Sequence, residues 1–170
     1  EVKSATGLNY QNITSLVEDP AEKGHYYASS FGYGLYEFRD GKFVKHYNRK
    51  NSGLVSVLSD TTNKFIDRYV RVPRLKYDAK GNLWMTNTGT KDIIKVLKID
   101  GTWQPLHYDA IAKHPTMVEM LFDSRGWLWV TSLQADAGLF CAKMNGTPLD
   151  TSDDETKLVT EVFRNQDGIS

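Results

Sequence analysis

Short hydrophobic runs separated by glycine-containing turns recur along this chain at a regular interval. Residues 75–87 read LKYDAKGNLWMTN, and residues 121–132 repeat the pattern as LFDSRGWLWVTS. An Asp, a Gly and a Trp match between the two copies, about 45 residues apart. A degraded copy covers residues 16–27, where Tyr27 takes the place of the tryptophan, and a further copy begins at residues 159–168. The chain is therefore expected to be built from repeated units.

A second pattern completes each unit. Two hydrophobic runs flank a turn dipeptide at the same place in every copy: Asp40-Gly41, Asp100-Gly101 and Asn145-Gly146. Such dipeptides favour tight hairpins, because both turn residues accept positive φ. Each unit thus predicts four short strands, which in the middle copy cover residues 71–77, 82–87, 93–99 and 102–108. Helical periodicity is confined to a short stretch at 109–113, which ends before Pro115.

Four strands recurring every 40–45 residues or so are typical of a β-propeller blade. We expect an all-β fold with four-stranded antiparallel blades near 12–50, 70–109 and 116–150, and a fourth blade starting near 157. Propellers close with about 4–8 blades, so 170 residues predict an open or partial ring unless residues 1–10 complete the fourth blade. A β-sandwich of eight or nine strands is the competing architecture, although it would not need the repeated cassette.

The strands of the repeat are apolar on both faces, as expected for a sheet covered by a neighbour on each side. Leu83, Trp84 and Met85 are consecutive, and residues 127–130 are WLWV. Trp84 and Trp129 are therefore predicted to pack between blades. The first and last blades would each leave one apolar face uncovered, so we expect self-association through the end blades or a longer parent chain. The first residue is Glu1 rather than Met, which favours a processed or excised piece.

The cassette Gly81-Asn-Leu-Trp84, preceded by Asp78 and followed by a Gly-Leu-Tyr type of strand, resembles the two-component-regulator propeller repeat. Residues 7–19 resemble the run-in of the same repeat. This family builds the periplasmic sensor regions of Bacteroidetes hybrid two-component systems and the propellers of PorZ-like proteins of the type IX secretion system. The cassettes here end in WMTN and WVTS instead of the usual WIGT, and the insert at 47–70 is long. With residues 31–41, these departures favour the PorZ-like group.

The resemblance implies an exported, periplasmic or cell-surface propeller that binds a glycan, a lipopolysaccharide or a protein partner without catalysis. The alternative within the family is the periplasmic ligand-sensing region of a hybrid two-component regulator. An enzyme similar to streptogramin lyase is a further alternative, since that group shares the architecture and uses a metal and a catalytic histidine on one face. Fold alone does not separate these functions.

The amino-acid composition limits the kinds of partner that the chain is expected to bind. The chain has 21 basic and 21 acidic residues, so its formal net charge of zero argues against general nucleic-acid or anionic-membrane binding. No apolar run approaches the ~18 residues of a membrane helix. Cys141 has no second cysteine with which to form an internal disulfide, and its place within an apolar run predicts a small buried side chain.

Three aromatic residues are the candidate ligand-binding side chains. The repeat does not require Trp103 and Trp127, and the position of Tyr33 between the second and third strands favours exposure at one face of the ring. Tyr33 lies between two glycines in a strand connection, Trp103 follows the Asp100-Gly101 turn, and Trp127 lies beside the turn of the third cassette. A glycine-rich turn for Tyr33, and structural filling for the two tryptophans, are the competing interpretations.

No catalytic, cofactor or metal site is predicted. The four histidines form no His-x-His or His-x-x-x-His pair: His25, His46, His107 and His114. The acidic run at 150–155 places Asp150, Ser152, Asp154 and Glu161 at ligand positions of a calcium loop, but Glu155 stands where the loop requires glycine. A solvated loop is therefore expected. Gly-x-Ser-x-Gly, a phosphate-binding glycine loop and a Cys–His pair are all missing.

Overall fold

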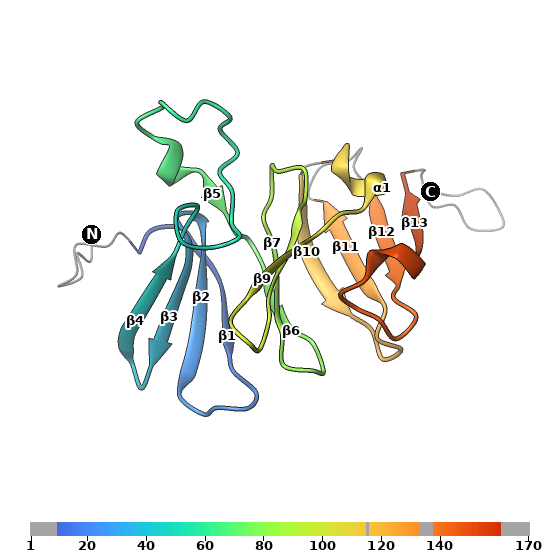
Figure 1. Ribbon diagram of the computed structural model, residues 1–170, viewed down its shortest axis with the longest axis horizontal. Helices are drawn as coiled ribbons and strands as arrows, with labels where there is room; N and C mark the ends of the chain where they lie inside the picture. The colour runs from blue at the N-terminus through green and yellow to red at the C-terminus, as the bar shows by residue number, and fades with distance from the viewer. Residues whose placement is uncertain (1–9, 115, 133–137, 161–170) are drawn as a thin grey trace, which may run out of the picture.

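Three antiparallel β-sheets stand side by side in the computed structural model, which describes residues 10–114, 116–132 and 138–160 (Figure 1). Blade 1 contains β1 (Ile13–Glu18), β2 (His25–Gly32), β3 (Gly34–Arg39) and β4 (Lys42–Tyr47), with β5 (Val70–Arg71) paired to β2. Blade 2 contains β6 (Leu75–Tyr77), β7 (Leu83–Thr86), β8 (Ile94–Leu97) and β9 (Trp103–Leu106). Blade 3 contains β10 (Met117–Phe122), β11 (Leu128–Ser132), β12 (Leu139–Lys143) and β13 (Glu155–Val159).

Helix is almost absent from the described part of the chain. It consists of the short α1 (Asp109–Ala112) and two single 3₁₀ turns, η1 (Ile66–Arg68) and η2 (Thr151–Asp153). The four main strands of each blade follow sequence order, so each of them pairs with the next one along the chain, and β5 is the exception because it pairs with β2. The predicted all-β fold of four-stranded antiparallel blades is confirmed, and the one helix lies where the sequence placed it.

The repeated Asp and Trp of the cassette are joined by a hydrogen bond. In blade 2, Trp84 Nε1 donates to Asp78 Oδ2 at 2.8 Å, and the same oxygen accepts from the Asn82 side chain. Asp78 Oδ1 accepts from two backbone N–H groups of the turn, and Gly81 closes this turn with φ +83°. A positive φ of this kind favours glycine. The carboxylate therefore fixes both the turn and the indole, which explains why these residues recur together.

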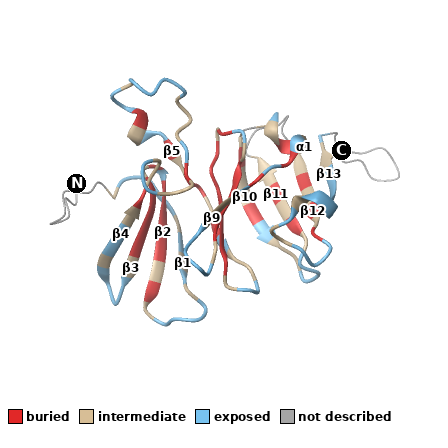
Figure 2. Ribbon diagram, in the orientation of Figure 1, coloured by how far each residue is buried: buried red, intermediate tan, exposed pale blue. Residues whose placement is uncertain are grey.

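Blade 2 lies between the other two blades and is buried on both faces (Figure 2). Leu83 and Met85 of β7 face blade 1, where they join Leu35 and Tyr27 in one apolar cluster. Trp84 points the other way, is 0% exposed, and belongs to the cluster shared with blade 3. The consecutive apolar residues of β7 thus fill two separate cores.

Blade 3 extends beyond the predicted boundary, which corrects the expected start of a fourth blade near 157. Residues Glu155–Val159 form β13, which pairs antiparallel with β12 as the fourth strand of blade 3. The Asn145-Gly146 turn does form, but the chain then runs through η2 before it returns to the sheet. The Asn145-Gly146 dipeptide therefore predicted where the turn forms, but not how many residues connect β12 to β13. The copy expected at 159–168, and residues 1–10 that were considered as a completion of the fourth blade, lie almost entirely outside the described residues.

Burial distinguishes the two tryptophans that were predicted to be equivalent. Trp84 is fully buried, as predicted, whereas Trp129 is only partly buried. Trp129 lies on the side of blade 3 that faces away from blade 2, together with Leu121, which is 48% exposed. We refer to this side, formed by Leu121, Trp129, Leu139, Cys141 and Val159, as the outer face of blade 3.

Candidate functional site

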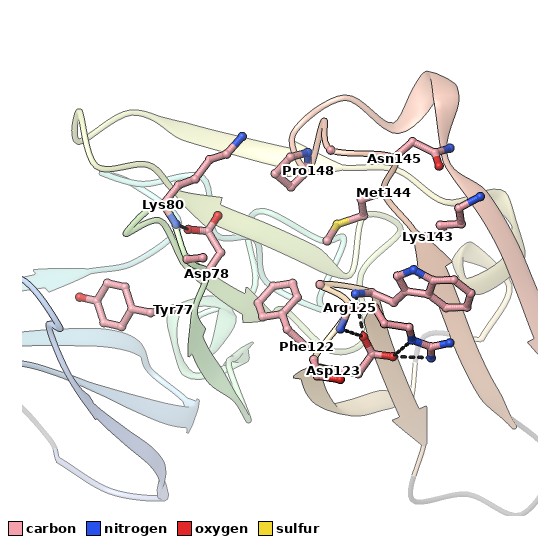
Figure 3. A pocket seen from close by; sticks show the side chains of 15 residues that line it. Tyr77, Asp78, Lys80, Phe122, Asp123, Arg125, Lys143, Met144, Asn145 and Pro148 are labelled. Atoms are coloured by element: carbon pink, nitrogen blue, oxygen red, sulfur yellow. Dashed lines mark hydrogen bonds and ion pairs between the residues drawn. The ribbon is translucent and has the colours of Figure 1, made fainter.

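The turns that join the first strand to the second, and the third strand to the fourth, share one edge of the blades. This follows from the antiparallel order, since successive connections alternate between the two ends of a sheet. A pocket of about 590 Å³ opens at this edge between blades 2 and 3, a size typical of ligand-binding pockets (Figure 3). Its walls come from the β6–β7 turn, the β10–β11 turn and residues 143–148.

Trp127 and Arg125 form one wall of this pocket. The guanidinium carbon of Arg125 lies 3.8 Å from the centroid of the Trp127 ring, a close cation–π contact. The same guanidinium donates to Asp123 Oδ2 from Nε at 3.0 Å and from Nη2 at 2.5 Å. Two contacts therefore fix the orientation of an exposed arginine.

The carboxylate of Asp123 positions both Arg125 and Trp127. It also accepts from Trp129 Nε1 at 3.0 Å and from the backbone N–H groups of Arg125 and Trp127. These donors, with Arg125 the strongest, hold the pKa of Asp123 well below its usual range. The carboxylate therefore stays ionised and keeps the turn and both aromatic side chains in place.

Two lysines complete the charge distribution of the pocket. Lys80 lies on the blade 2 side, and Lys143 lies on the opposite side near Asn145, as Figure 3 shows. Lys143 Nζ pairs with Glu155 Oε1 at 2.5 Å. Phe122, Met144 and Pro148 supply apolar surface. A flat aromatic wall with cations on two sides suits a ligand that combines an apolar ring face with an acidic group.

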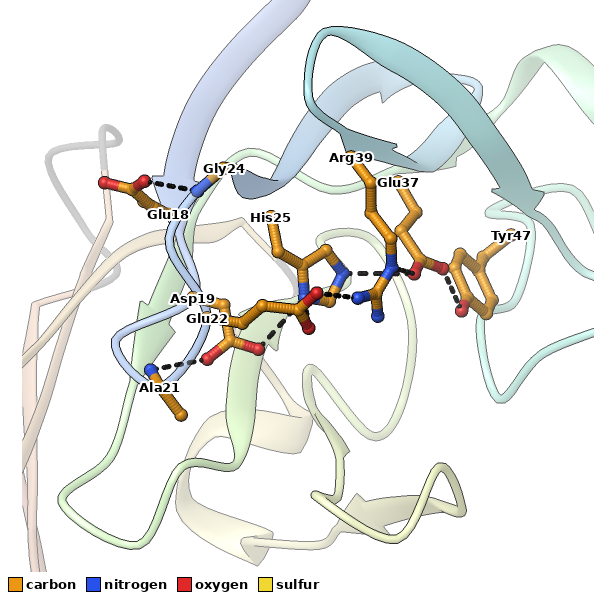
Figure 4. Close-up of polar contacts among 9 residues, drawn as sticks. All are labelled: Glu18, Asp19, Ala21, Glu22, Gly24, His25, Glu37, Arg39 and Tyr47. Carbon is orange, nitrogen blue, oxygen red and sulfur yellow. Dashed lines mark hydrogen bonds and ion pairs between the residues drawn. The ribbon is translucent and has the colours of Figure 1, made fainter.

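A second group of polar side chains surrounds His25 between blades 1 and 2 (Figure 4). His25 is 4% exposed, and each of its ring nitrogens faces a carboxylate: Nδ1 lies 3.1 Å from Asp19 Oδ2, and Nε2 lies 3.0 Å from Glu37 Oε1. The Tyr47 hydroxyl donates to Glu37 Oε2 at 2.7 Å. Burial raises the pKa of the neighbouring Tyr27 to about 12, so this hydroxyl stays protonated. Asp19, Glu22 and His25 are the described residues grouped closely enough to hold a metal ion.

The structure separates the three predicted ligand-binding residues. Trp127 lines the pocket of Figure 3. Trp103 packs between blades 1 and 2, with its ring centroid 5.8 Å from that of Tyr47. Tyr33 joins β2 to β3, at the opposite edge of blade 1 from the pocket edge, and its carbonyl oxygen lies 2.5 Å from His46 Nε2.

Two sets of residues were missed by the sequence analysis. Arg125 and Lys80 occupy the variable positions of the Asp-x-x-Gly turns, and a comparison of these positions between copies would have revealed both cations. The group around His25 is carried by the spacing Asp19-x-x-Glu22-x-x-His25. A search restricted to pairs of histidines passes over such a pattern.

The acidic run and Cys141 also have definite positions. Asp150 Oδ1 accepts from Ser152 N at 3.0 Å and caps η2, while Asp154 accepts from the Tyr108 hydroxyl at 2.7 Å. Glu161 lies outside the described residues. Cys141 is partly exposed on the outer face of blade 3, and burial raises the pKa of its thiol. Within the described residues, no helix is long and apolar enough to cross a membrane.

Comparison with known proteins connects this fold to solved structures. No family model matches the chain, and no curated protein matches its sequence. PorZ, a bacterial surface component of the type-IX secretion system of Porphyromonas gingivalis, matches 92% of the chain with a TM-score of 0.75 and 25% identity. The extracellular domains of two hybrid two component systems from B. thetaiotaomicron match 88% and 82% of the chain, with TM-scores of 0.59 and 0.54 and identities of 17% and 19%.

The matched region is a small part of each of these proteins. The chain spans 20% of the PorZ chain and 18% and 16% of the two extracellular domains. These neighbours are propeller-type domains, in agreement with the blades described above. By its fold, the chain is therefore similar to the propellers of PorZ and of the Bacteroides hybrid two-component sensors.

Proposed function

We propose that this chain is a segment of an exported, PorZ-like surface propeller that binds a partner without catalysing a reaction. The higher TM-score of the PorZ match, 0.75 against 0.59 and 0.54, supports PorZ over the sensor domains. The chain spans a fifth of PorZ, so the partner would be recognised by a larger protein of which these blades are one part.

The pocket between blades 2 and 3 is the proposed binding site, and the observation that carries it is the Trp127–Arg125 stack. An indole offers a flat apolar surface to the C–H face of a sugar ring or to an apolar side chain. Arg125 and Lys143 are already paired with Asp123 and Glu155, so Lys80 is the lining cation that would attract an acidic substituent. An acidic glycan, such as the saccharide of a lipopolysaccharide, fits this surface better than a neutral protein segment.

The test is binding of the full chain to a glycan array and to purified lipopolysaccharide, with Trp127→Ala as the variant. Loss of a stacking aromatic at the centre of a site is expected to weaken binding about tenfold or more. Phe65→Ala is the matched control, because Phe65 is an exposed aromatic outside the pocket, 41% exposed next to η1. Equal binding by both variants would show that the pocket is not the recognition site.

The second candidate is the ligand-sensing region of a hybrid two-component regulator, supported by the likeness to the B. thetaiotaomicron extracellular domains. The two proposals differ in the rest of the protein. A transmembrane helix followed by a kinase in the parent gene would favour the sensor, whereas a second propeller and a C-terminal β-sandwich would favour the PorZ-like component.

A further inference from the structure

Three potential metal ligands converge at the start of β2. His25 Nδ1 lies 3.1 Å from Asp19 Oδ2 and 3.4 Å from Glu22 Oε2, and the three atoms all lie within 4.8 Å of one another. Ligand atoms bonded to one Zn²⁺ at about 2.1 Å are about 3.4 Å apart in a tetrahedron and about 3.0 Å apart in an octahedron. Two of the three distances between these atoms therefore already match the separation of two ligand atoms bound to one ion.

Asp19, Glu22 and His25 each have a second polar side-chain atom, which bonds to a separate partner. Asp19 Oδ1 accepts from Ala21 N at 2.9 Å, and Glu22 Oε1 accepts from Arg39. His25 Nε2 bonds to Glu37, whose other oxygen accepts from Tyr47. A carboxylate behind the distal nitrogen is the usual outer shell of a metal-bound histidine, because it fixes the tautomer and the ring orientation. The three remaining atoms, Asp19 Oδ2, Glu22 Oε2 and His25 Nδ1, are those that lie within 4.8 Å of one another, and Figure 4 shows their side chains meeting beside the imidazole.

Charge favours a divalent cation at this point. The carboxylates of Asp19, Glu22 and Glu37 surround His25, and the guanidinium of Arg39 is the cation paired with them. With a neutral imidazole, three carboxylates and one guanidinium leave a formal charge of −2. A neutral imidazole also has one N–H, although both of its nitrogens face carboxylate oxygens. A metal ion at Nδ1 would satisfy both nitrogens, because the single N–H would then lie on Nε2 and donate to Glu37 Oε1.

The cluster is specific to blade 1. Asp19 corresponds to Asp78 and Asp123, but its turn is longer and contributes Glu22. His25 takes the place of Asn82 and Trp127, since each of these residues accepts through its carbonyl from the N–H of the turn aspartate. The site also borders a pocket of about 300 Å³, and Glu22 is 49% exposed, so an ion and its water ligands can enter.

We propose that Asp19, Glu22 and His25 bind one divalent transition-metal ion of the zinc type between blades 1 and 2. One imidazole and two carboxylates suit Zn²⁺ or Mn²⁺, with water in the open positions. The ion would tie the β1–β2 turn to the end of β2. This proposal departs from the absence of a metal site predicted from the sequence, which considered histidine pairs and the acidic run at 150–155 but not the spacing of Asp19, Glu22 and His25.

The test is titration of the chelator-treated full chain with ZnCl₂ by calorimetry, together with Co²⁺ as an optical probe. We expect one site, a rise in Tm of several degrees, and visible d–d absorption with Co²⁺. Glu22→Gln is expected to weaken Zn²⁺ binding about tenfold or more. Because Glu22 is an exposed side chain, this variant should fold, and circular dichroism checks that it does.

His107→Gln is the matched control. His107 also has a carboxylate at each ring nitrogen, Asp92 at 2.7 Å and Asp109 at 3.0 Å, but its side chain is 40% exposed and lies outside the cluster. This variant should bind Zn²⁺ as the original chain does. ¹⁵N NMR of His25 gives an independent readout, since metal binding displaces the Nδ1 proton. Retention of both ring protons at saturating Zn²⁺, no shift in Tm, or equal loss of binding in both variants would overturn the proposal.

Discussion

The ring of Trp84 on β7 meets the ring of Phe122 on β10 edge to face, with centroids 5.1 Å apart and planes at 87°. This contact crosses from blade 2 to blade 3, so it shows what the repeated tryptophan does: it extends from one blade to pack on the next. Trp129 occupies the same position in blade 3, but among the described residues no blade follows to cover it.

This difference predicts unequal effects of two equivalent substitutions. Trp84→Ala should lower the free energy of unfolding by about 3–5 kcal/mol, because it leaves a cavity among buried side chains and removes one of the two hydrogen bonds to Asp78 Oδ2. Trp129→Ala should lower it by clearly less, since its ring is partly exposed. Urea denaturation of both variants measures the difference. Equal losses would mean that the outer face of blade 3 is covered in solution.

The sequence predicted those parts of the fold that depend on residues close together along the chain. The Asp-x-x-Gly turns and the hairpin dipeptides are local features, and in blade 2 three of the four predicted strands agree with the observed ones to within two residues at each end. The strand predicted at 71–77 divides instead into β5, which pairs with β2 of blade 1, and β6 of blade 2. The return of β13 was missed because the pairing of β12 with β13 depends on a connection that passes through η2, and its length is not encoded in the Asn145-Gly146 turn.

The candidate sites were less predictable because they depend on contacts between blades. Trp127 was identified as an aromatic that the repeat does not require, and its stacking with Arg125 is local to the β10–β11 turn, but Lys80 faces it only because blades 2 and 3 are adjacent. The environment of His25 depends instead on contacts within blade 1, with Glu37 and Tyr47 from two later strands of the same sheet. Residue spacing alone does not contain this information.

Acid is expected to destabilise the folded chain through protonation of Asp123. Its pKa is lowered in the folded state, chiefly by Arg125, so its contribution to stability is fully present above the unfolded pKa of about 3.9 and is lost as pH falls toward the lower folded value. The expected result is a smaller fall in Tm between pH 5 and pH 2 for Asp123→Asn than for the original chain. Asp40→Asn serves as a control, because its carboxylate is in a hairpin turn away from this network. Identical acid profiles for all three chains would contradict the assigned role.

The outer face of blade 3 predicts concentration-dependent association. Leu121 is 48% exposed there beside Trp129, and apolar patches of this kind are seldom left uncovered on monomers. Leu121→Lys should lower the average mass measured by light scattering. Ile99→Lys is the matched control, since Ile99 is 73% exposed in the turn between β8 and β9 and lies off this face. An unchanged mass for Leu121→Lys, or an equal change for both variants, would exclude this face as the contact.

Cys141 provides a chemical probe of the same face. It pairs with Trp129 across β11 and β12, is partly exposed, and has a thiol whose pKa is raised by burial. The thiolate is the reactive form, so alkylation by a maleimide at pH 7 should be slower than for a free cysteine and should accelerate as pH rises. If copies associate through the outer face of blade 3, raising the protein concentration should slow the reaction further, and Leu121→Lys should abolish this concentration dependence. A rate that is fast at pH 7 and independent of concentration in both chains would show that the thiol is open to solvent and that this face is not a contact.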